Sequence, residues 1–365
     1  MMEKKNTDLP ADDGKSTSPL TDKKQWLFMA LFAVIAVVSV WAVVAQSREF
    51  SLSDFGTYIQ DASLPWLAVA LLSMLGFILF EAFALLVLCR ALGYRQSLWR
   101  GYIYSASDIY FSAITPSATG GQPASAYFMI KDGMNGMMVT AILIANLCMY
   151  TSAIIVIGFL CFFIRFDIFL QYSLPSQILI VVGFLMQIGL LIFFFMVLRH
   201  ERLLHRMCSA VLRFLCKVRI LKKQEEKQEK LDAYMEKYRQ HTKLITEHPK
   251  AMVFCFLFNL LQRTSQIAVT MFVYAATTGK GFWDAVELWF WQGYVVLGTN
   301  CVPIPGAMGI SDYMMLDGFQ NIMEQSQAVN LELLSRSFSF YSCVIICGIS
   351  VLIQYCAVKK RGKLT

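Results

Sequence analysis

The stretch Thr115–Phe128 reads TPSATGGQPASAYF and contains two prolines and two adjacent glycines. Proline lacks a backbone donor and glycine is conformationally permissive, so together they interrupt a helix. Yet apolar runs long enough to cross about 30 Å of hydrocarbon lie on both sides of this stretch. The organisation of the rest of the chain explains why an interruption stands there.

The composition predicts an all-α, polytopic membrane protein with about six full spans. Of the 365 residues, 57% are hydrophobic and 16% are charged, whereas a soluble domain carries about a quarter charged residues. The first apolar run is favoured as an uncleaved anchor over a signal peptide, and polar residues 1–22 are expected to be a disordered cytoplasmic tail. The predicted crossings are 26–45, 66–89, 137–164, 177–198, 251–277 and 335–358.

The distribution of basic residues predicts the orientation of the membrane domain, 23–360. Segment 199–250 contains fourteen Lys and Arg against seven Asp and Glu, which is typical of a cytoplasmic loop. Segment 321–334 has two acids and no base, so we expect an outer loop there. Both termini are therefore predicted to be cytoplasmic. The basic segment 199–250 is expected to be helical and to contact anionic lipids of the inner leaflet.

Two broken segments are predicted to be re-entrant hairpins of opposite direction. Segment 101–131 has both ends on the predicted cytoplasmic side, and 282–320 has both ends on the outer side. Paired interrupted segments of this kind indicate the central site of a transporter. Two ordinary crossings with proline kinks are the alternative. The residues that break the two segments are Pro116, Pro123, Pro303, Pro305, Gly306 and Gly309.

Ionisable residues inside apolar runs indicate where a polar ligand would bind, because each costs about 2.5–3.5 kcal/mol to insert. Arg263 suits bidentate capture of a lipid phosphate, and a structural pair with Glu81 is equally open. Asp108 and Asp312 suit a cationic head group or a helix cap, and capping is favoured for Asp312. The candidate lipid-binding residues are Glu81, Asp108, Thr115, Gly120, Gly121, Gln122, Arg263, Asn300 and Asp312.

The stretches TPSATGGQPASAYFMIKDG and PIPGAMGISD resemble the two signatures of the membrane region of bacterial lysylphosphatidylglycerol synthases, the multiple peptide resistance factors. The resemblance covers about residues 25–360. Many members have Glu where Gln122 stands and Arg near Ser125 or Ala126, so this chain lacks two of their charges. The residues that match the signatures are Pro116, Gly120, Gly121, Pro123, Pro303, Pro305, Gly306, Gly309 and Asp312.

The resemblance implies a flippase of the bacterial cell membrane for anionic or aminoacylated phosphatidylglycerol-type lipids, in a stand-alone form without the soluble synthase domain. It also implies roles in lipid metabolism and antibiotic resistance. The expected partners are membrane phospholipid and a separate lipid-modifying synthase, and a homo-oligomer is left open.

Two other functions stay open at this point. One is a membrane component of lysylphosphatidylglycerol synthesis, labelled phosphatidylglycerol lysyltransferase by its family. The other is an ion-coupled secondary transporter of a small solute, which opposed hairpins also permit. All four histidines fall in 199–250 and no motif for nucleotides, metals or nucleic acid is present. No catalytic residue, metal site, cofactor or nucleic-acid partner is therefore predicted.

Overall fold

The computed structural model describes residues 52–115, 118–199, 209–210, 248–279 and 281–361. All regular structure in these parts is helical. The α-helices are α2 (Leu52–Gln60), α3 (Leu64–Ala91), α4 (Leu98–Ile114), α5 (Gly121–Lys131), α6 (Gly136–Ile164), α7 (Phe166–Gln171), α8 (Leu174–Arg199), α11 (Pro249–Thr278), α12 (Phe282–Thr299), α13 (Ile310–Phe319), α14 (Gln325–Arg336) and α15 (Ser342–Arg361). The short helices are the 3₁₀ turn η2 (Pro305–Ala307) and the π turn η3 (Ser337–Tyr341).

Five helices of the described chain are long and apolar enough to cross a membrane: α3, α6, α8, α11 and the run from α14 into α15. They coincide with five of the six predicted crossings, so the prediction of an all-α polytopic membrane protein is confirmed. The sixth predicted crossing (26–45), the tail (1–22) and most of the basic segment (199–250) lie outside the described residues.

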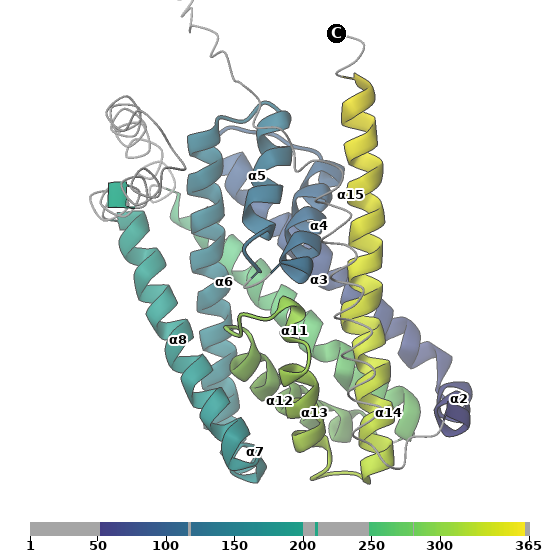
Figure 1. The fold of residues 1–365 in the computed structure, drawn as a ribbon. Coiled ribbons are helices and arrows are strands. Elements are labelled where there is room, and N and C mark those ends of the chain that lie inside the picture. Colours follow the sequence, from purple (N-terminus) through teal and green to yellow (C-terminus); the bar gives the residue numbers. More distant parts are fainter. Residues whose placement is uncertain (1–51, 116–117, 200–208, 211–247, 280, 362–365) are drawn as a thin grey trace, which may run out of the picture.

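Helices α3 and α11 run antiparallel and form the most extensive helix–helix contact in the described chain (Figure 1). At the start of α3, the Ser63 amide donates to the Ala276 carbonyl near the end of α11 at 2.7 Å. Nearby, the rings of Trp66 and Phe272 stack with centroids 5.8 Å apart. Because both helices are apolar around much of their circumference, they bury one side against each other and offer the other sides to further helices.

The first broken segment is a hairpin of two short helices, α4 and α5. They measure about 26 Å and about 16 Å at 1.5 Å per residue, and neither reaches the length of the spanning helices. The open end of the hairpin is closed by Tyr104, whose hydroxyl donates to Asp132 at 2.6 Å. This end lies beside the start of α6, where the Asn135 amide donates to Tyr94.

The second broken segment is also a helical hairpin, formed by α12 and α13 with η2 at its tip. The arms are antiparallel, because Gly298 packs against Met314 and Gly318 packs against Trp291. The open end lies beside the chain that follows α6, where Tyr172 donates to the Trp291 carbonyl at 2.9 Å.

The two hairpins therefore enter the bundle from opposite ends of α6, a helix of about 43 Å. Figure 1 shows α4 and α5 beside one end of α6 and α12 and α13 toward the other. At the tips, η2 contacts α4. Two opposed helical hairpins are thus present in the fold, while their re-entrant character and the side of the membrane that each faces stay predictions.

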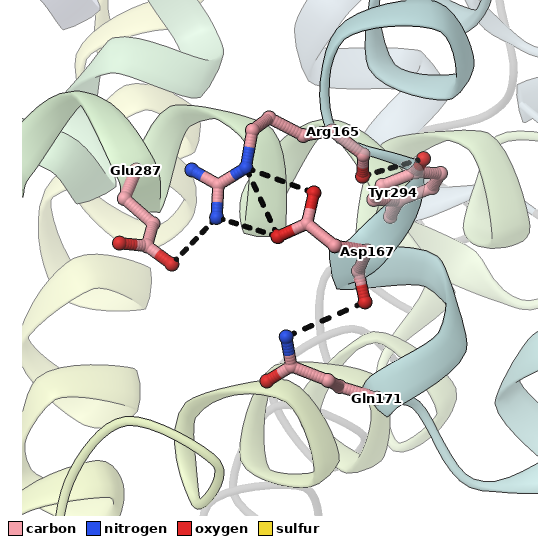
Figure 2. Close-up of polar contacts among 5 residues, drawn as sticks. All are labelled: Arg165, Asp167, Gln171, Glu287 and Tyr294. Carbon is pink, nitrogen blue, oxygen red and sulfur yellow. Dashed lines mark hydrogen bonds and ion pairs between the residues drawn. The ribbon is translucent and has the colours of Figure 1, made fainter.

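A charged cluster joins α12 to the end of α6 (Figure 2). Arg165 pairs with Asp167 at 2.9 Å and with Glu287 of α12 at 3.0 Å, and Tyr294 donates to the Arg165 carbonyl. Hydrogen bonds from Arg165 lower the pKa of Asp167 below its ordinary value, and the same bonds raise the pKa of Arg165. The cluster links α12, the first arm of the second hairpin, to the end of α6.

The prediction of an outer loop at 321–334 is wrong for most of that segment. Residues from Gln325 onward form α14, which continues through η3 into α15 as one candidate span. Glu332 is 1% exposed and Arg336 is 7% exposed, so neither is a solvated loop residue. The two side chains stand four residues apart on one helix face, 4.0 Å from each other, and this pairing permits their burial.

Candidate functional site

A cavity of about 590 Å³ lies where the hairpin tips meet the long helices. Its wall receives residues from α3, α4, α5, α6, α8, α11, α12 and the α14–η3–α15 run. The wall is unusually polar for the interior of an apolar bundle. The charged and amide residues that line it are Glu81, Asp108, Gln122, Asn146, Gln187, Gln262, Arg263, Gln266, Gln292, Asn300 and Arg336.

Arg263 of α11 presents a guanidinium group to this cavity. Its Nη atoms donate to the Tyr150 hydroxyl and to Gln266 Oε1, and its Cζ lies 4.2 Å from the centre of the Tyr150 ring. Both hydrogen-bond partners are neutral, and Arg263 makes no ion pair with any described carboxylate. Its Nε is buried without an acceptor. Arg263 therefore offers a charge and an unfilled donor to an anion.

Glu81 of α3 is held by two neighbours other than Arg263. Gln262 Nε2 donates to Glu81 Oε2 at 2.9 Å and Ser105 Oγ donates to the same oxygen at 3.3 Å. The direct Glu81–Arg263 pair considered from the sequence is absent from the described residues. Gln262 and Arg263 are adjacent on α11 and point about 100° apart, so only one of them faces Glu81.

Asp108 connects the two arms of the first hairpin close to its tip. Gln122 of α5 donates to Asp108 Oδ2 at 2.6 Å, and Ser112 donates to Oδ1 at 3.2 Å. Gly121 makes this approach possible, because a Cβ there would lie 2.0 Å from Asp108 Oδ1. The sequence prediction of a close approach at this glycine is borne out by that geometry.

The remaining predicted residues of the first tip do not reach the cavity wall. Thr115 Oγ1 donates to the Phe111 carbonyl and accepts from the Gly120 amide at 2.9 Å. This pair closes the tip in the way that a capping residue closes a helix end. Thr115, Gly120 and Gly121 thus shape the hairpin, whereas Glu81, Asp108, Gln122, Arg263 and Asn300 of the predicted set line the cavity. Pro116 lies outside the described residues.

In the second hairpin, Asp312 is a capping residue, as favoured from the sequence. Its Oδ2 accepts from the Gly309 amide at 2.9 Å at the start of α13. Its Oδ1 also lies 2.8 Å from Arg336 Nε. Of the breaker residues at this tip, Gly306 lines the cavity, and Pro303, Pro305 and Gly309 are not part of its wall.

Tyr150 and Arg336 also line the cavity and were not in the predicted set. Arg336 is buried. Its signal was Glu332 four residues before it, because an acid and a base at this spacing share a helix face. Tyr150 carries no charge and stands in an apolar run without a distinguishing pattern. Asn146 of α6 accepts a hydrogen bond from Asn259 of α11 at 3.0 Å.

The edge of the cavity is apolar and exposed. Met186 of α8 is 48% exposed and Ile304 before η2 is 37% exposed, and both line the cavity. Since α8 is a candidate span, we expect this edge to face the hydrocarbon region. A polar interior beside an apolar edge suits an amphipathic ligand. In the chain the structure describes, no three His, Cys, Asp or Glu side chains gather as metal ligands.

Comparison with known proteins gives two matches over nearly the whole chain. The family model described as "Lysylphosphatidylglycerol synthase TM region" matches residues 28–347. A protein of Archaeoglobus fulgidus named "UPF0104 membrane protein" is 24% identical over 342 residues, which is 91% of this chain and 98% of that protein. The residues matched by the family model include both hairpins and the helices α3, α6, α8 and α11.

Proposed function

The chain belongs to the family of the lysylphosphatidylglycerol synthase transmembrane region, and we propose that it is a phospholipid translocase. The substrate is an anionic or aminoacylated lipid of the phosphatidylglycerol type. The phosphate binds Arg263 in the cavity and the acyl chains stay at the apolar edge beside α8.

The single observation that carries this proposal is the position of Arg263. A guanidinium with only neutral hydrogen-bond partners and an unfilled Nε lines a cavity between two opposed hairpins. Glu81 and Asp108 interact with this charge across the cavity, but neither forms an ion pair with it in the described chain. A buried guanidinium without a direct ion pair is costly, and a bound phosphate supplies one. The exposed apolar edge at Met186 supports a lipid over a small soluble anion.

One alternative has an observation in its favour. Glu81 and Asp108 are 5% and 7% exposed and line the same cavity. Buried acids in a transporter commonly relay protons, so an ion-coupled transporter of a small solute is the second candidate. A flux that requires a pH gradient and accepts a solute without acyl chains would favour it. A phosphatidylglycerol lysyltransferase role rests on the family description alone.

The proposal extends to the surroundings of the protein. We place it in the bacterial cell membrane with cytoplasmic termini, where the basic segment 199–250 contacts anionic inner-leaflet lipids. A separate synthase supplies the aminoacylated lipid, and its translocation contributes to antibiotic resistance. Homo-oligomerisation is a matter for direct measurement.

The test is translocation in proteoliposomes that contain head-group-labelled phosphatidylglycerol or its lysyl ester. A membrane-impermeant quencher added outside reports the fraction of label in the outer leaflet. We expect wild-type protein to raise the quenchable fraction and Arg263→Ala to abolish that rise. Wild-type flux from Arg263→Ala would contradict the proposal.

The matched control is Arg90→Ala, which removes the same charge from an exposed position at the end of α3. It should translocate at the wild-type rate. Equal losses in Arg90→Ala and Arg263→Ala would indicate that net charge, and not the cavity, is responsible.

A further inference from the structure

A second buried arginine, Arg336, lines the same cavity from the side of the second hairpin. It is the last residue of α14 and directly precedes the π turn η3, where the Ser342 amide bonds to the Ser337 carbonyl. A π turn inserts an extra residue into the helix and redirects the side chains around it, and such turns occur frequently at functional sites. The Arg336 guanidinium stands over the Phe340 ring at 4.9 Å.

The hydrogen-bond donors of Arg336 are incompletely satisfied. The residue is 7% exposed. Its Nε is 2.8 Å from Asp312 Oδ1, so that carboxylate is its partner, whereas Nη2 is buried and has no hydrogen-bond acceptor in the described chain. Buried donors of a charged group are rarely left unfilled. A ligand oxygen in the cavity would fill the donor at Nη2.

The surroundings of Arg336 favour an anion on the cavity side. Ser311 and Arg336 line the cavity, whereas Asp312 and Glu332 are not part of its wall. The start of α13 also lies here, and the positive end of a helix dipole attracts anions. The two acids lie on the Nε side of the guanidinium, which leaves Nη2 to a ligand.

We infer that Arg336 is a second phosphate-binding residue of the cavity, which contacts a phosphodiester oxygen from the side of the second hairpin. This inference rests on the proposed function for the identity of the ligand as a phospholipid. Arg263 on α11 and Arg336 before η3 then form two cationic walls, one beside each hairpin. A phosphate held between them keeps a counter-charge while either hairpin moves.

The test measures binding separately from translocation. Detergent-solubilised protein is titrated with dihexanoyl phosphatidylglycerol, with uncharged dihexanoylglycerol and with inorganic phosphate in calorimetry. We expect Arg336→Gln to weaken the binding of dihexanoyl phosphatidylglycerol about tenfold or more, the loss of a charge-assisted hydrogen bond. Arg336→Lys should lose less affinity than Arg336→Gln, because lysine retains the positive charge but lacks the planar donors of the guanidinium.

Two further variants keep the outcome interpretable. The first is a triple variant that combines Arg336→Gln with Asp312→Asn and Glu332→Gln. It leaves no unpaired buried acid, and the Asn still caps α13. Loss of binding in this folded protein would therefore be due to the missing guanidinium. Arg165→Gln removes an arginine that also pairs with two acids but lies outside the cavity wall, and its affinity should equal that of wild type.

The possible results separate the two claims. Wild-type affinity in folded Arg336→Gln would overturn the inference and leave the translocase proposal intact. Arg336-dependent lipid binding without translocation would support the inference and count against the translocase. Equally tight binding of inorganic phosphate would support an anion site and assign the ligand to a soluble phosphate. A wild-type protein that binds none of the three probes would overturn both claims.

Discussion

Gly121 is the position in the first hairpin where an added side chain would have the least room. In Gly121→Ala, the Cβ would lie 2.0 Å from Ser112 Oγ and 2.6 Å from the Asp108 carbonyl, which is backbone and cannot rotate away. We expect α4 and α5 to separate and the protein to lose about 1–3 kcal/mol, the usual penalty of overpacking. Thermal unfolding in detergent measures this loss.

The matched control for that prediction is Gly189→Ala in α8, where a Cβ meets no atom within 4 Å. This change should be neutral or slightly stabilising, because alanine favours a helix over glycine. If both variants melt at the wild-type temperature, the arms of the hairpin are not in close contact.

Asp167 gives the protein a pH dependence outside the membrane. Hydrogen bonds from Arg165 lower the pKa of Asp167 in the folded state, so its pairing stabilises the fold above the unfolded pKa of about 3.9. The stabilisation is lost as the pH falls through the lowered folded value. Because Asp167 is half exposed, we expect at most about 1 kcal/mol at neutral pH.

The measurement is the melting temperature of wild type and Asp167→Asn between pH 7 and pH 3. The difference between the two should be constant at the upper end and shrink below about pH 4. Asp61→Asn, at an exposed acid after α2, serves as the comparison. A wild-type advantage that persists unchanged to the lowest pH would rule out this ion pair as its source.

At this scale the sequence identified charged residues better than their partners. Glu81, Asp108 and Arg263 stood out because a charge in an apolar run is costly, and all three line the cavity. Which neighbour each would meet depends on the rotation of one helix against another. Hydropathy leaves that rotation open, so Gln262 and not Arg263 turned out to hold Glu81.

Among the elements, the long helices were predictable because their length is imposed by the bilayer. The predicted run 66–89 differs from α3 by two residues at each end. The hairpins were predictable from paired Pro and Gly residues in otherwise apolar runs. The helix in segment 321–334 was not predictable, because two acids without a base are typical of a loop. The structure shows that Glu332 is buried beside Arg336, which lies just beyond the end of this segment.

The tip of the second hairpin is held against the π turn by Gly306. A Cβ at Gly306 would lie 2.3 Å from Phe340 Cζ, and the residue has φ of +60°. Gly306→Ala should therefore add a steric clash of about 1–3 kcal/mol to a backbone strain of about 1–2 kcal/mol. We expect a lower melting temperature and a displaced hairpin tip.

Gly279→Ala separates these two contributions. Gly279, after α11, has φ of +62° and ψ of +6°, close to the backbone of Gly306, and a Cβ there meets nothing within 4 Å, so only the backbone strain applies. Combining Gly306→Ala with Phe340→Leu should relieve the clash and not the strain. Equal melting temperatures for the Gly306 and Gly279 variants would mean that η2 does not press on η3.

Across the whole molecule, the two hairpins place their tips near the middle of α6 from opposite ends. Each hairpin alone would leave helix ends and tip backbone inside an apolar layer, where unsatisfied polar groups are strongly disfavoured. Together with α3, α6 and α11, they enclose those groups in one polar cavity. The cavity is thus a consequence of the opposed arrangement, and a single hairpin with the same residues would not form it.

This arrangement predicts that the open ends of the hairpins face opposite sides of the membrane. Exposed Lys131 ends α5 and exposed Gln325 begins α14 just after the second hairpin. By the distribution of basic residues, a cysteine at Lys131 should react with a membrane-impermeant maleimide only after the cells are permeabilised. A cysteine at Gln325 should react in intact cells.

The labelling uses a background in which Cys208, Cys216, Cys301 and Cys356 are replaced by serine, and labelling of denatured protein provides the reference for complete reaction. Reaction of both new cysteines from one side would contradict the opposed arrangement. Exchange of the two sides would preserve the fold and reverse the orientation, so the open end of the second hairpin would then face the cytoplasm. The two results therefore distinguish an error in architecture from an error in direction.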